Sequence, residues 1–173
     1  MSDVSTALTL LVPTNEHIAK INEIRSVDDR AYHRWPPHIN ILFPFDTVEN
    51  FPDIAKTLSE KLSGFGAIEL DCNSLGYFAQ GKNITVHLKP SDTARLCELF
   101  KQVTEALPTI AHNDFVPHLT IGQFKKSDRE EVMNELAKWL GTGIKFTVTK
   151  LSLLSRSASD KSVPFSVHTD ISL

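Results

Sequence analysis

Two short segments repeat each other 80 positions apart in a chain of 173 residues. Pro37-His38-Ile39-Asn40-Ile41 and Pro117-His118-Leu119-Thr120-Ile121 agree in kind at five consecutive positions. Each copy follows a proline and alternates polar with aliphatic residues, which is the pattern of a half-buried strand. Because the spacing is nearly half the chain, we predict two related lobes that each carry one copy.

The repeat also predicts where its polar side chains lie. Residues i and i+2 of a strand point to the same face, so His38 is expected beside Asn40, and His118 beside Thr120. The aliphatic residues between them would face the core. If a pseudo-two-fold axis relates the lobes, the two polar faces meet in one cleft that holds two imidazoles and two short hydrogen-bonding groups.

The rest of the pattern predicts several strands interleaved with four helices. Alternating or continuous apolar runs predict strands at residues 6–12, 38–43, 68–72, 84–88, 118–124, 146–154 and 164–171. Helical spacing predicts helices near residues 15–28, 54–62, 92–107 and 127–140, with N-caps at Asn15, at Ser91 or Asp92, and at Ser127.

The turn-rich segment 79–83 should join two of these strands as an antiparallel hairpin, which a purely parallel sheet would not contain. We therefore predict an α+β fold, with antiparallel-rich sheets and flanking helices around a central cleft. Residues 1–173 would form a single domain of two duplicated, pseudo-symmetric lobes.

Two histidines in matched settings suit displacement at phosphorus. With an unperturbed pKa near ~6.5, one imidazole can take a proton from the attacking water or hydroxyl while the other, protonated, gives one to the leaving oxygen. Asn40 and Thr120 can donate hydrogen bonds to the non-bridging phosphate oxygens. Opening a cyclic phosphate, whose leaving oxygen stays tethered, fits this arrangement.

A metal centre is the chemical rival, and the sequence disfavours it. The histidines are not part of an HxH or HExxH pattern, Asn and Thr are poor zinc ligands, and Cys72 and Cys97 lack zinc-type spacing. We expect no metal and no cofactor.

Charge and composition exclude some other classes of protein. A net charge of −3 and a pI near 6.1 argue against a protein that coats duplex nucleic acid, but not against a locally held anion. Residues 1–9 lack the pattern of a signal peptide, and no apolar run is long enough to span a membrane. We expect a reducing compartment, the cytoplasm or nucleus, and a monomeric protein.

The paired motifs resemble those of the two-histidine (2H) phosphoesterase superfamily, in particular the LigT-like group of 2'-5' RNA ligases and cyclic phosphodiesterases. The resemblance covers most of the chain, and Phe115 to Gly122 is similar to the usual second motif. It implies that His38 and His118 form the acid/base pair and that Thr120 binds phosphate. The departure is Asn40, which stands where the family usually has a hydroxyl residue.

Two further residues complete the predicted substrate site. Arg156, which follows the expected strand residues 151–154, is favoured over Arg34 as a basic group near the phosphate. Phe78, next to Tyr77 at the start of the expected hairpin turn, is favoured for stacking on a base.

The other aromatic residues and histidines are given simpler roles. Phe43 and Phe124 are expected to pack in the core. His87, on the strand expected at 84–88, could line the cleft, but a packing role is favoured.

The favoured function is therefore a metal-independent phosphodiesterase that hydrolyses 2',3'-cyclic phosphates of nucleotides or RNA ends, with reversible 2'-5' RNA ligation as an accompanying activity. A nucleotide- or RNA-binding module with a non-catalytic pocket is the alternative, suggested by Asn40. A protein-interaction domain with a vestigial site is the third.

Overall fold

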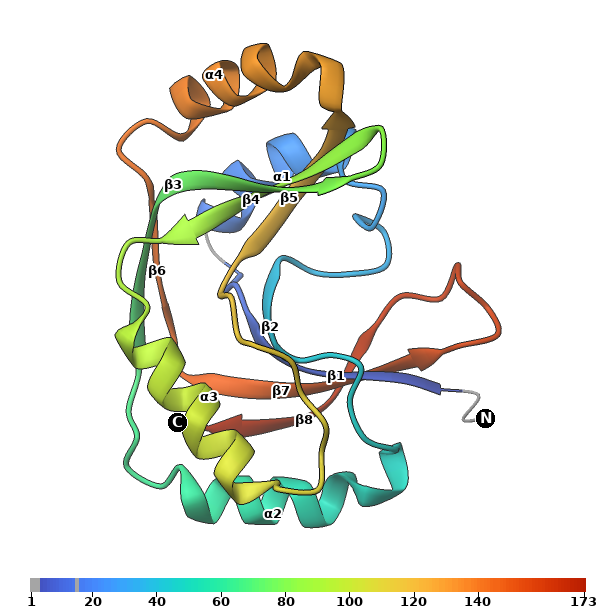
Figure 1. Ribbon diagram of the computed structural model, residues 1–173. Helices are drawn as coiled ribbons and strands as arrows, with labels where there is room; N and C mark the ends of the chain where they lie inside the picture. Colours follow the sequence, from blue (N-terminus) through green and yellow to red (C-terminus); the bar gives the residue numbers. More distant parts are fainter. Residues whose placement is uncertain (1–3, 15) are drawn as a thin grey trace.

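The computed structural model describes residues 4–14 and 16–173, and its strands form two four-stranded antiparallel sheets (Figure 1). The first sheet has the order β2-β1-β7-β8 and consists of β1 (Val4–Leu11), β2 (His38–Leu42), β7 (Lys150–Ser157) and β8 (Ser166–Ser172). The second has the order β5-β4-β3-β6 and consists of β3 (Ile68–Gln80), β4 (Asn83–Pro90), β5 (Leu119–Lys125) and β6 (Ile144–Val148).

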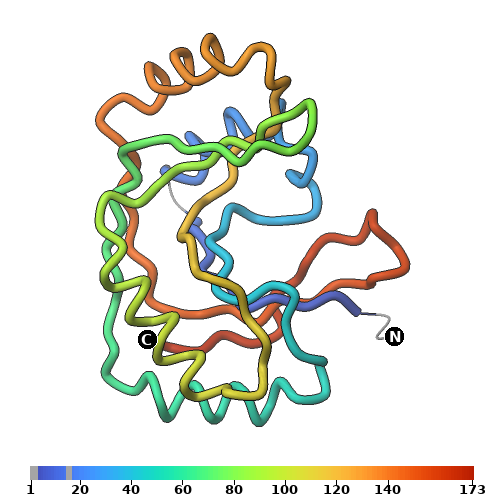
Figure 2. The backbone as a smooth tube through the Cα atoms, viewed as in Figure 1, coloured from blue at the N-terminus to red at the C-terminus, as the bar shows by residue number. Residues whose placement is uncertain are grey.

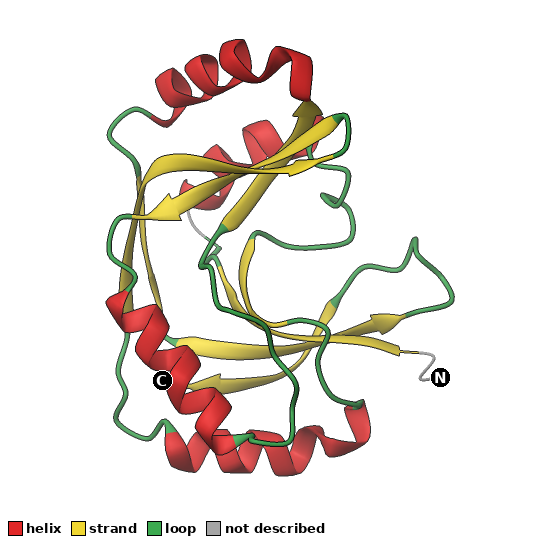
Figure 3. Ribbon diagram, viewed as in Figure 1, coloured by secondary structure: helices red, strands yellow, loops and turns green. Residues whose placement is uncertain are grey.

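Four α-helices cover the outer sides of the sheets (Figure 3). They are α1 (Glu16–Asp28), α2 (Phe51–Lys61), α3 (Ala94–Ala106) and α4 (Arg129–Leu140), and short 3-10 helices, Val48–Asn50 and Lys126–Asp128, precede α2 and α4. Helices α1 and α4 pack on the second sheet, whereas α2 packs on β8 and beside α3. The predicted α+β fold is confirmed.

The first sheet is built from both ends of the chain, so the two sheets are not sequential halves. Helix α1 follows β1 of the first sheet but packs against β5 of the second. The largest cluster of buried apolar side chains draws on both sheets and all four helices. This shared core fixes the sheets relative to one another.

The strand predicted at 146–154 is wrong. The chain leaves the second sheet after Val148 and enters the first at Lys150, so the segment forms β6 and β7 in different sheets. The burial pattern changes at the same point: β6 alternates, whereas four consecutive residues of β7, Leu151–Leu154, are buried. Both patterns are compatible with strands, so apolarity alone did not separate them.

Two predicted N-caps are also wrong. Helix α4 is capped at Asp128, because Ser127 lies within the preceding 3-10 helix. Helix α3 is capped at Thr93, although the Asp92 side chain does accept a hydrogen bond from the Ala94 amide at 2.8 Å. The proposed cap Asn15 lies outside the described residues.

The predicted hairpin forms between β3 and β4, but its first strand is longer than expected. Strand β3 continues to Gln80, and the turn falls at Gly81, whose φ of +60° suits glycine. Tyr77 and Phe78 therefore lie within the strand, on opposite faces of the sheet, instead of at the start of a turn.

Both histidine motifs lie on edge strands. Strand β2 is the edge of the first sheet, β5 is the edge of the second, and the two contact each other near the centre of the molecule (Figure 1). Residues 107–118 lead from the end of α3 to the start of β5, as Figure 2 traces. The fold thus places the two motifs side by side.

Candidate active site

The two motif histidines are held by the same backbone hydrogen bond. Nδ1 of His38 lies 2.7 Å from the Pro36 carbonyl oxygen, and Nδ1 of His118 lies 2.7 Å from the Val116 carbonyl oxygen. A carbonyl only accepts, so both rings carry their proton on Nδ1 when neutral. Within the described residues no protein group bonds to Nε2 of either ring, which leaves that atom for a substrate.

His38 lies in a partly buried aromatic setting. The Trp35 ring stacks on it with centroids 4.3 Å apart and an interplanar angle of 18°. Burial lowers the pKa of His38 to about 4, and the positive charges of Arg25 and His118 act in the same direction. The Pro36 hydrogen bond and Asp29 act against this shift. Near neutral pH His38 is therefore an uncharged proton acceptor.

A buried ion pair holds the loop that leads to His38. Arg25 and Asp29 are joined at 2.8 Å, and each side chain is only 2% exposed. The same guanidinium donates to the Trp35 carbonyl at 2.8 Å. Arg25 lies one helical turn after the buried Ile21, on the same face of α1. The buried face of α1 therefore carries a charged side chain in its last turn.

Hydrogen bonds also connect this ion pair to β5, the strand of the second motif. Gln123 on β5 donates to Asp29 Oδ1 at 3.3 Å and accepts from the Arg30 amide at 2.9 Å. These bonds tie the approach to the first motif directly to the strand that follows His118. The network thereby couples the relative positions of the two histidines.

His118 has different neighbours, which come from β3 and β4. The His87 ring lies 5.2 Å from it, centroid to centroid, and the Phe78 ring 5.0 Å away and edge-on. Phe78 and His87 stack on each other at 4.5 Å. Gly76 leaves room for this arrangement, since a Cβ there would lie 2.5 Å from His87 Nε2.

His87 is buried, with 4% of its surface exposed, although its Nδ1 has no hydrogen-bond partner among the described residues. Burial lowers the pKa of His87 to about 4, and the charges of His118 and Lys89 contribute. A neutral third imidazole therefore packs against the second motif. The packing role predicted for His87 agrees with this position, but its contact with His118 was not predicted.

The polar partners of the histidines occupy matched positions. Thr120 lies opposite His87 on β4, and Asn40 lies opposite Thr9 on β1. The Oδ1 atom of Asn40 is buried and has no partner in the described structure. A cavity of about 440 Å³ is lined by Asn40 from one motif and His118 from the other.

Arg156, the predicted basic ligand, lies within the inner strand β7. Its guanidinium packs over the Phe165 ring at 5.1 Å, and Phe165 in turn packs on Trp35 at 3.8 Å. A chain of contacts through two aromatic rings therefore links Arg156 to His38. Arg156 is not among the residues that line the cavity shared by Asn40 and His118.

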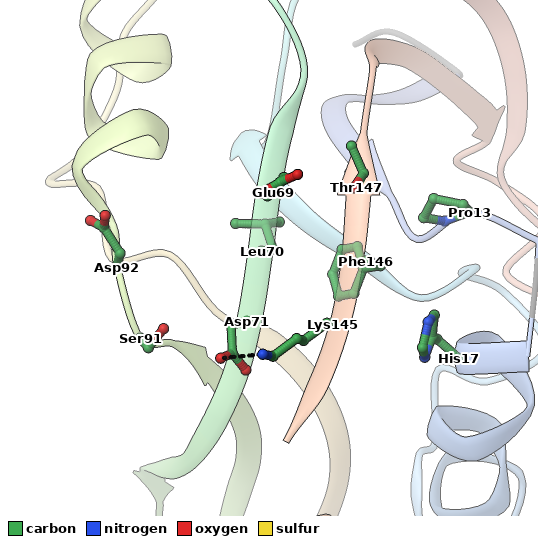
Figure 4. Close-up of a pocket in the computed structure, with 10 residues that line it drawn as sticks. All are labelled: Pro13, His17, Glu69, Leu70, Asp71, Ser91, Asp92, Lys145, Phe146 and Thr147. Atoms are coloured by element: carbon green, nitrogen blue, oxygen red, sulfur yellow. Dashed lines mark ion pairs between the residues drawn. The ribbon is translucent and has the colours of Figure 1, made fainter. Parts of the chain in front are cut away.

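A larger groove of about 630 Å³ lies elsewhere, along β3 and β6 (Figure 4). Asp71 and Lys145 point toward each other across it and form an ion pair at 3.7 Å. Neither histidine motif lines this groove. Among the residues described, no group of three or more His, Cys, Asp or Glu side chains is placed to hold a metal ion.

The sequence match agrees with this geometry. Residues 13–160 match the family model described as the 2'-5' RNA ligase superfamily. The chain belongs to this superfamily. The resemblance to 2H phosphoesterases is thereby confirmed.

Relatives of the superfamily extend the comparison. A protein of Staphylococcus haemolyticus that carries a provisional phosphoesterase name is 30% identical over 146 residues, which cover 83% of this chain and 86% of the relative. Escherichia coli LigT in its apo form superposes with a TM-score of 0.70 at 14% identity, covering 99% of each chain. The LigT complex with 3'-AMP gives 0.69 at 11% identity, again covering 99% of each chain.

Sequence reasoning missed several residues that surround the site in this superfamily member. Arg25 and Asp29 stand four residues apart, which is an ordinary surface pattern for a helix. Asp29 also accepts a hydrogen bond from Gln123 of β5, which lies far away in the sequence. The prediction that Phe43 packs in the core is wrong, since its side chain is 48% exposed. Strand β2 ends at Leu42, and Phe43 follows it and lines the cavity.

The described chain contains no helix that is long and apolar enough to cross a membrane.

Proposed function

We propose that this protein is a phosphodiesterase that hydrolyses 2',3'-cyclic phosphates of nucleotides or RNA ends by metal-independent acid/base catalysis with His38 and His118. The observation that carries the proposal is the matched pair of imidazoles. Each uses Nδ1 for a backbone carbonyl and keeps Nε2 for proton exchange. His38 lies on the edge strand β2 and His118 immediately precedes the edge strand β5, close enough for the charge of one ring to affect the other.

In the proposed reaction, neutral His38 takes a proton from water as the water oxygen attacks phosphorus. The bond from phosphorus to one ribose oxygen breaks, and His118 gives its proton to that oxygen. The product is a phosphomonoester with a free hydroxyl on the neighbouring carbon. His38 ends protonated and His118 ends neutral, so one proton has in effect moved from His118 to His38. The low pKa of His38 supports its role as base. If a ribose 5'-hydroxyl attacked the cyclic phosphate in place of water and the bond from phosphorus to the 3' oxygen broke, the product would be a 2'-5' phosphodiester.

Thr120 and Asn40 would hold the non-bridging oxygens. A hydroxyl and an amide can each donate to an anionic oxygen as charge shifts in the transition state. We retain Phe78 as the aromatic group beside the second histidine, since it packs against His118. The positive charge of Arg156, which packs on Phe165 and through it on Trp35, would attract the phosphate without contacting it.

The comparisons support the reaction class. Superfamily membership and the phosphoesterase relatives favour a phosphoesterase, and LigT has been crystallised with 3'-AMP, phosphate, ATP and NADP+. Nucleotide binding by the same fold is consistent with a nucleotide substrate here. We further propose that the protein acts as a monomer in the cytoplasm or nucleus.

The test is turnover of adenosine 2',3'-cyclic phosphate by purified protein with a chelator present. His38→Ala and His118→Ala should each lower kcat by about 10²- to 10⁴-fold, the usual contribution of a positioned acid or base. The double variant should lose little more than either single variant, because the two histidines act together in the same chemical step. His168→Ala, at an exposed position on β8, is the matched control. Full activity in either motif variant contradicts the proposal.

A binding module is the second candidate, because Asn40 replaces the usual hydroxyl and its amide oxygen is buried without a partner. That function predicts nucleotide binding by calorimetry with no product formed. If Asn40→Thr then gives turnover, the chain is an enzyme that lost one phosphate ligand. If wild-type protein already turns over, the binding-only function is excluded.

A further inference from the structure

Each motif histidine packs against a ring, but the two rings come from different parts of the chain. Trp35 stands three residues before His38 and stacks on it at 4.3 Å. By the internal repeat, Phe115 stands three residues before His118. The Phe115 ring stacks instead on Phe100, with centroids 4.6 Å apart and planes 6° apart. The aromatic residue of the second motif is therefore directed to α3.

The ring that contacts the second histidine comes from β4. The His87 ring lies 5.2 Å from the His118 ring, centroid to centroid. His87 is paired with Thr120 on β5 and with Gly76 on β3. Directly opposite residues of antiparallel strands lie on one face of a sheet. His87 therefore occupies the same face as Thr120, next to the second motif.

The two ring contacts are built alike. On the first motif, Trp35 packs on Phe165, with centroids 3.8 Å apart and an interplanar angle of 31°. On the second, His87 packs on Phe78, with centroids 4.5 Å apart and an angle of 28°. Phe78 also meets the His118 ring edge-on at 5.0 Å. His87 thus takes the place that Trp35 has in the first motif, although it belongs to another strand.

Shape holds His87 in place. Its ring is buried, and its Nδ1 has no hydrogen-bond partner among the residues that the structure describes. The ring lies over Gly76, where a Cβ would come within 2.5 Å of Nε2 and 3.1 Å of Cε1. The stack with Phe78 covers another side. The orientation of His87 therefore depends on ring packing and on the missing side chain of Gly76.

From these contacts we propose that His87 is a positioning residue for the second motif, whose ring fixes the direction in which His118 presents Nε2 to the substrate. The Val116 carbonyl restrains Nδ1 of His118, but one hydrogen bond leaves the ring free to rock about it. Packing against His87 and Phe78 removes this freedom. Burial lowers the pKa of His87 to about 4, so near neutral pH its ring carries no charge that would repel a protonated His118.

The inference rests on the proposed function and deepens it. It adds a residue that acts on the substrate only through His118. A misoriented acid leaves the rest of the binding site intact. Loss of His87 should therefore slow the chemical step and leave substrate binding almost unchanged.

The test is steady-state turnover of adenosine 2',3'-cyclic phosphate. His87→Ala should lower kcat by about 10- to 10²-fold, as expected when a reacting group is misplaced by about 1 Å, with KM changed by less than about twofold. His87→Phe keeps a ring beside Phe78 and His118, so its kcat should stay within about threefold of wild type. The conservative variant thus restores what the truncation loses.

Val86→Ala is the matched control. Val86 is the neighbour of His87 on β4, is fully buried and points to the other face of the sheet. Its truncation should lower the free energy of unfolding but leave kcat unchanged. The positioning role is overturned if His87→Ala keeps the wild-type kcat, if His87→Phe is as slow as His87→Ala, or if Val86→Ala is slowed as much. If His87→Ala does not fold, His87→Leu, which fills the space without a ring, replaces it with the same expected loss.

Failure of the proposed function has a different signature, namely no turnover by any form of the protein. His87 is then judged by the NMR signals of the His118 ring protons, which the neighbouring rings displace. His87→Ala should move these signals toward the values of an exposed histidine, and His87→Phe should leave them displaced. The signals of His168, which is exposed on β8, should not move. Unchanged His118 signals in His87→Ala overturn the positioning role.

Discussion

The two histidine motifs share one backbone geometry but lie in different surroundings. His38 and His118 both bond through Nδ1 to the carbonyl two residues before them, at the same 2.7 Å. Around His38 the neighbours are Trp35 and the charged Arg25, whereas around His118 they are the neutral rings of His87 and Phe78.

The difference shows how a repeated motif can support two roles. The shared hydrogen bond fixes the tautomer and exposes the same atom on each ring. The surroundings then set the protonation state: burial and a neighbouring guanidinium keep His38 neutral. In the proposed mechanism the first motif therefore supplies the base, which leaves the acid role to the second.

The largest expected effect tests the charged support of the first motif. Asp29→Asn leaves Arg25 buried without its counter-ion, so the free energy of unfolding should fall by about 3–5 kcal/mol. Urea denaturation measures it. Glu105→Gln breaks the exposed Lys61–Glu105 pair and should cost less than about 1 kcal/mol. If Asp29→Asn lowers the free energy of unfolding no more than Glu105→Gln does, the buried Arg25–Asp29 pair does not stabilise the loop that leads to His38.

A smaller effect concerns the polar partners of the two motifs. Thr120→Val removes a donor to the phosphate and should lower kcat by about 10²-fold, near the lower end for loss of one transition-state donor. Asn40→Thr, which makes the first motif resemble the second, should preserve turnover. Steady-state kinetics decide, with Thr147→Val on the exposed face of β6 as control. Equal rates in wild type and Thr120→Val would remove Thr120 from the site.

The packing of the second motif can be disturbed from a neighbouring strand. Gly76→Ala places a methyl group 2.5 Å from His87 Nε2 and 2.9 Å from Lys89 Cδ. Such overpacking costs about 1–3 kcal/mol, and because His87 packs on His118 the variant should also lose activity. Thermal unfolding and turnover measure the two effects. A fully active, equally stable variant would show that His87 does not position His118.

The smallest expected effect is the pH dependence of the free energy of unfolding, which arises from two buried histidines. His38 and His87 have folded pKa values of about 4, below the unfolded value near ~6.5. Between these values the unfolded chain binds protons that the folded chain does not. The free energy of unfolding should therefore be highest above pH ~6.5 and fall toward pH ~4, by at most about 1.4 kcal/mol per pH unit for each histidine.

His87→Phe tests that slope, because it keeps a buried ring but removes one titrating group. Denaturation in a series of buffers should show a flatter pH dependence than in wild type. An unchanged slope would mean that His87 does not contribute to the acid sensitivity.

Local pattern was enough to find the motifs and most elements. The alternation around His38 and His118 depends only on neighbouring residues, so it predicted strands with a polar and an apolar face. The 3.6-residue periodicity likewise predicted α2, α3 and α4. The predicted helix starts were wrong where a second local structure was possible. At Ser127 a 3-10 helix forms, so α4 begins two residues later, at Arg129.

The surroundings of the site were less predictable because they join distant segments. Arg25 lies on a helix that packs on β5, and Phe43 follows the last residue of β2 with 48% of its side chain exposed. Helix α1 follows β1 of the first sheet but packs on β5 of the second, and the periodicity of its sequence does not predict which sheet it packs on. This packing also brings Asp29, just after α1, within hydrogen-bonding distance of Gln123 on β5.

The sequence by itself determined the two paired motifs and the face of the strand that each of their side chains occupies, because strand geometry alternates side chains regardless of context. Tertiary structure alone decided that the two edge strands meet, that His38 is neutral while Arg25 lies beside it, and that a cavity opens beyond Asn40. Burial and electrostatic fields are sums over neighbours from every part of the chain, so only the packed fold fixes them.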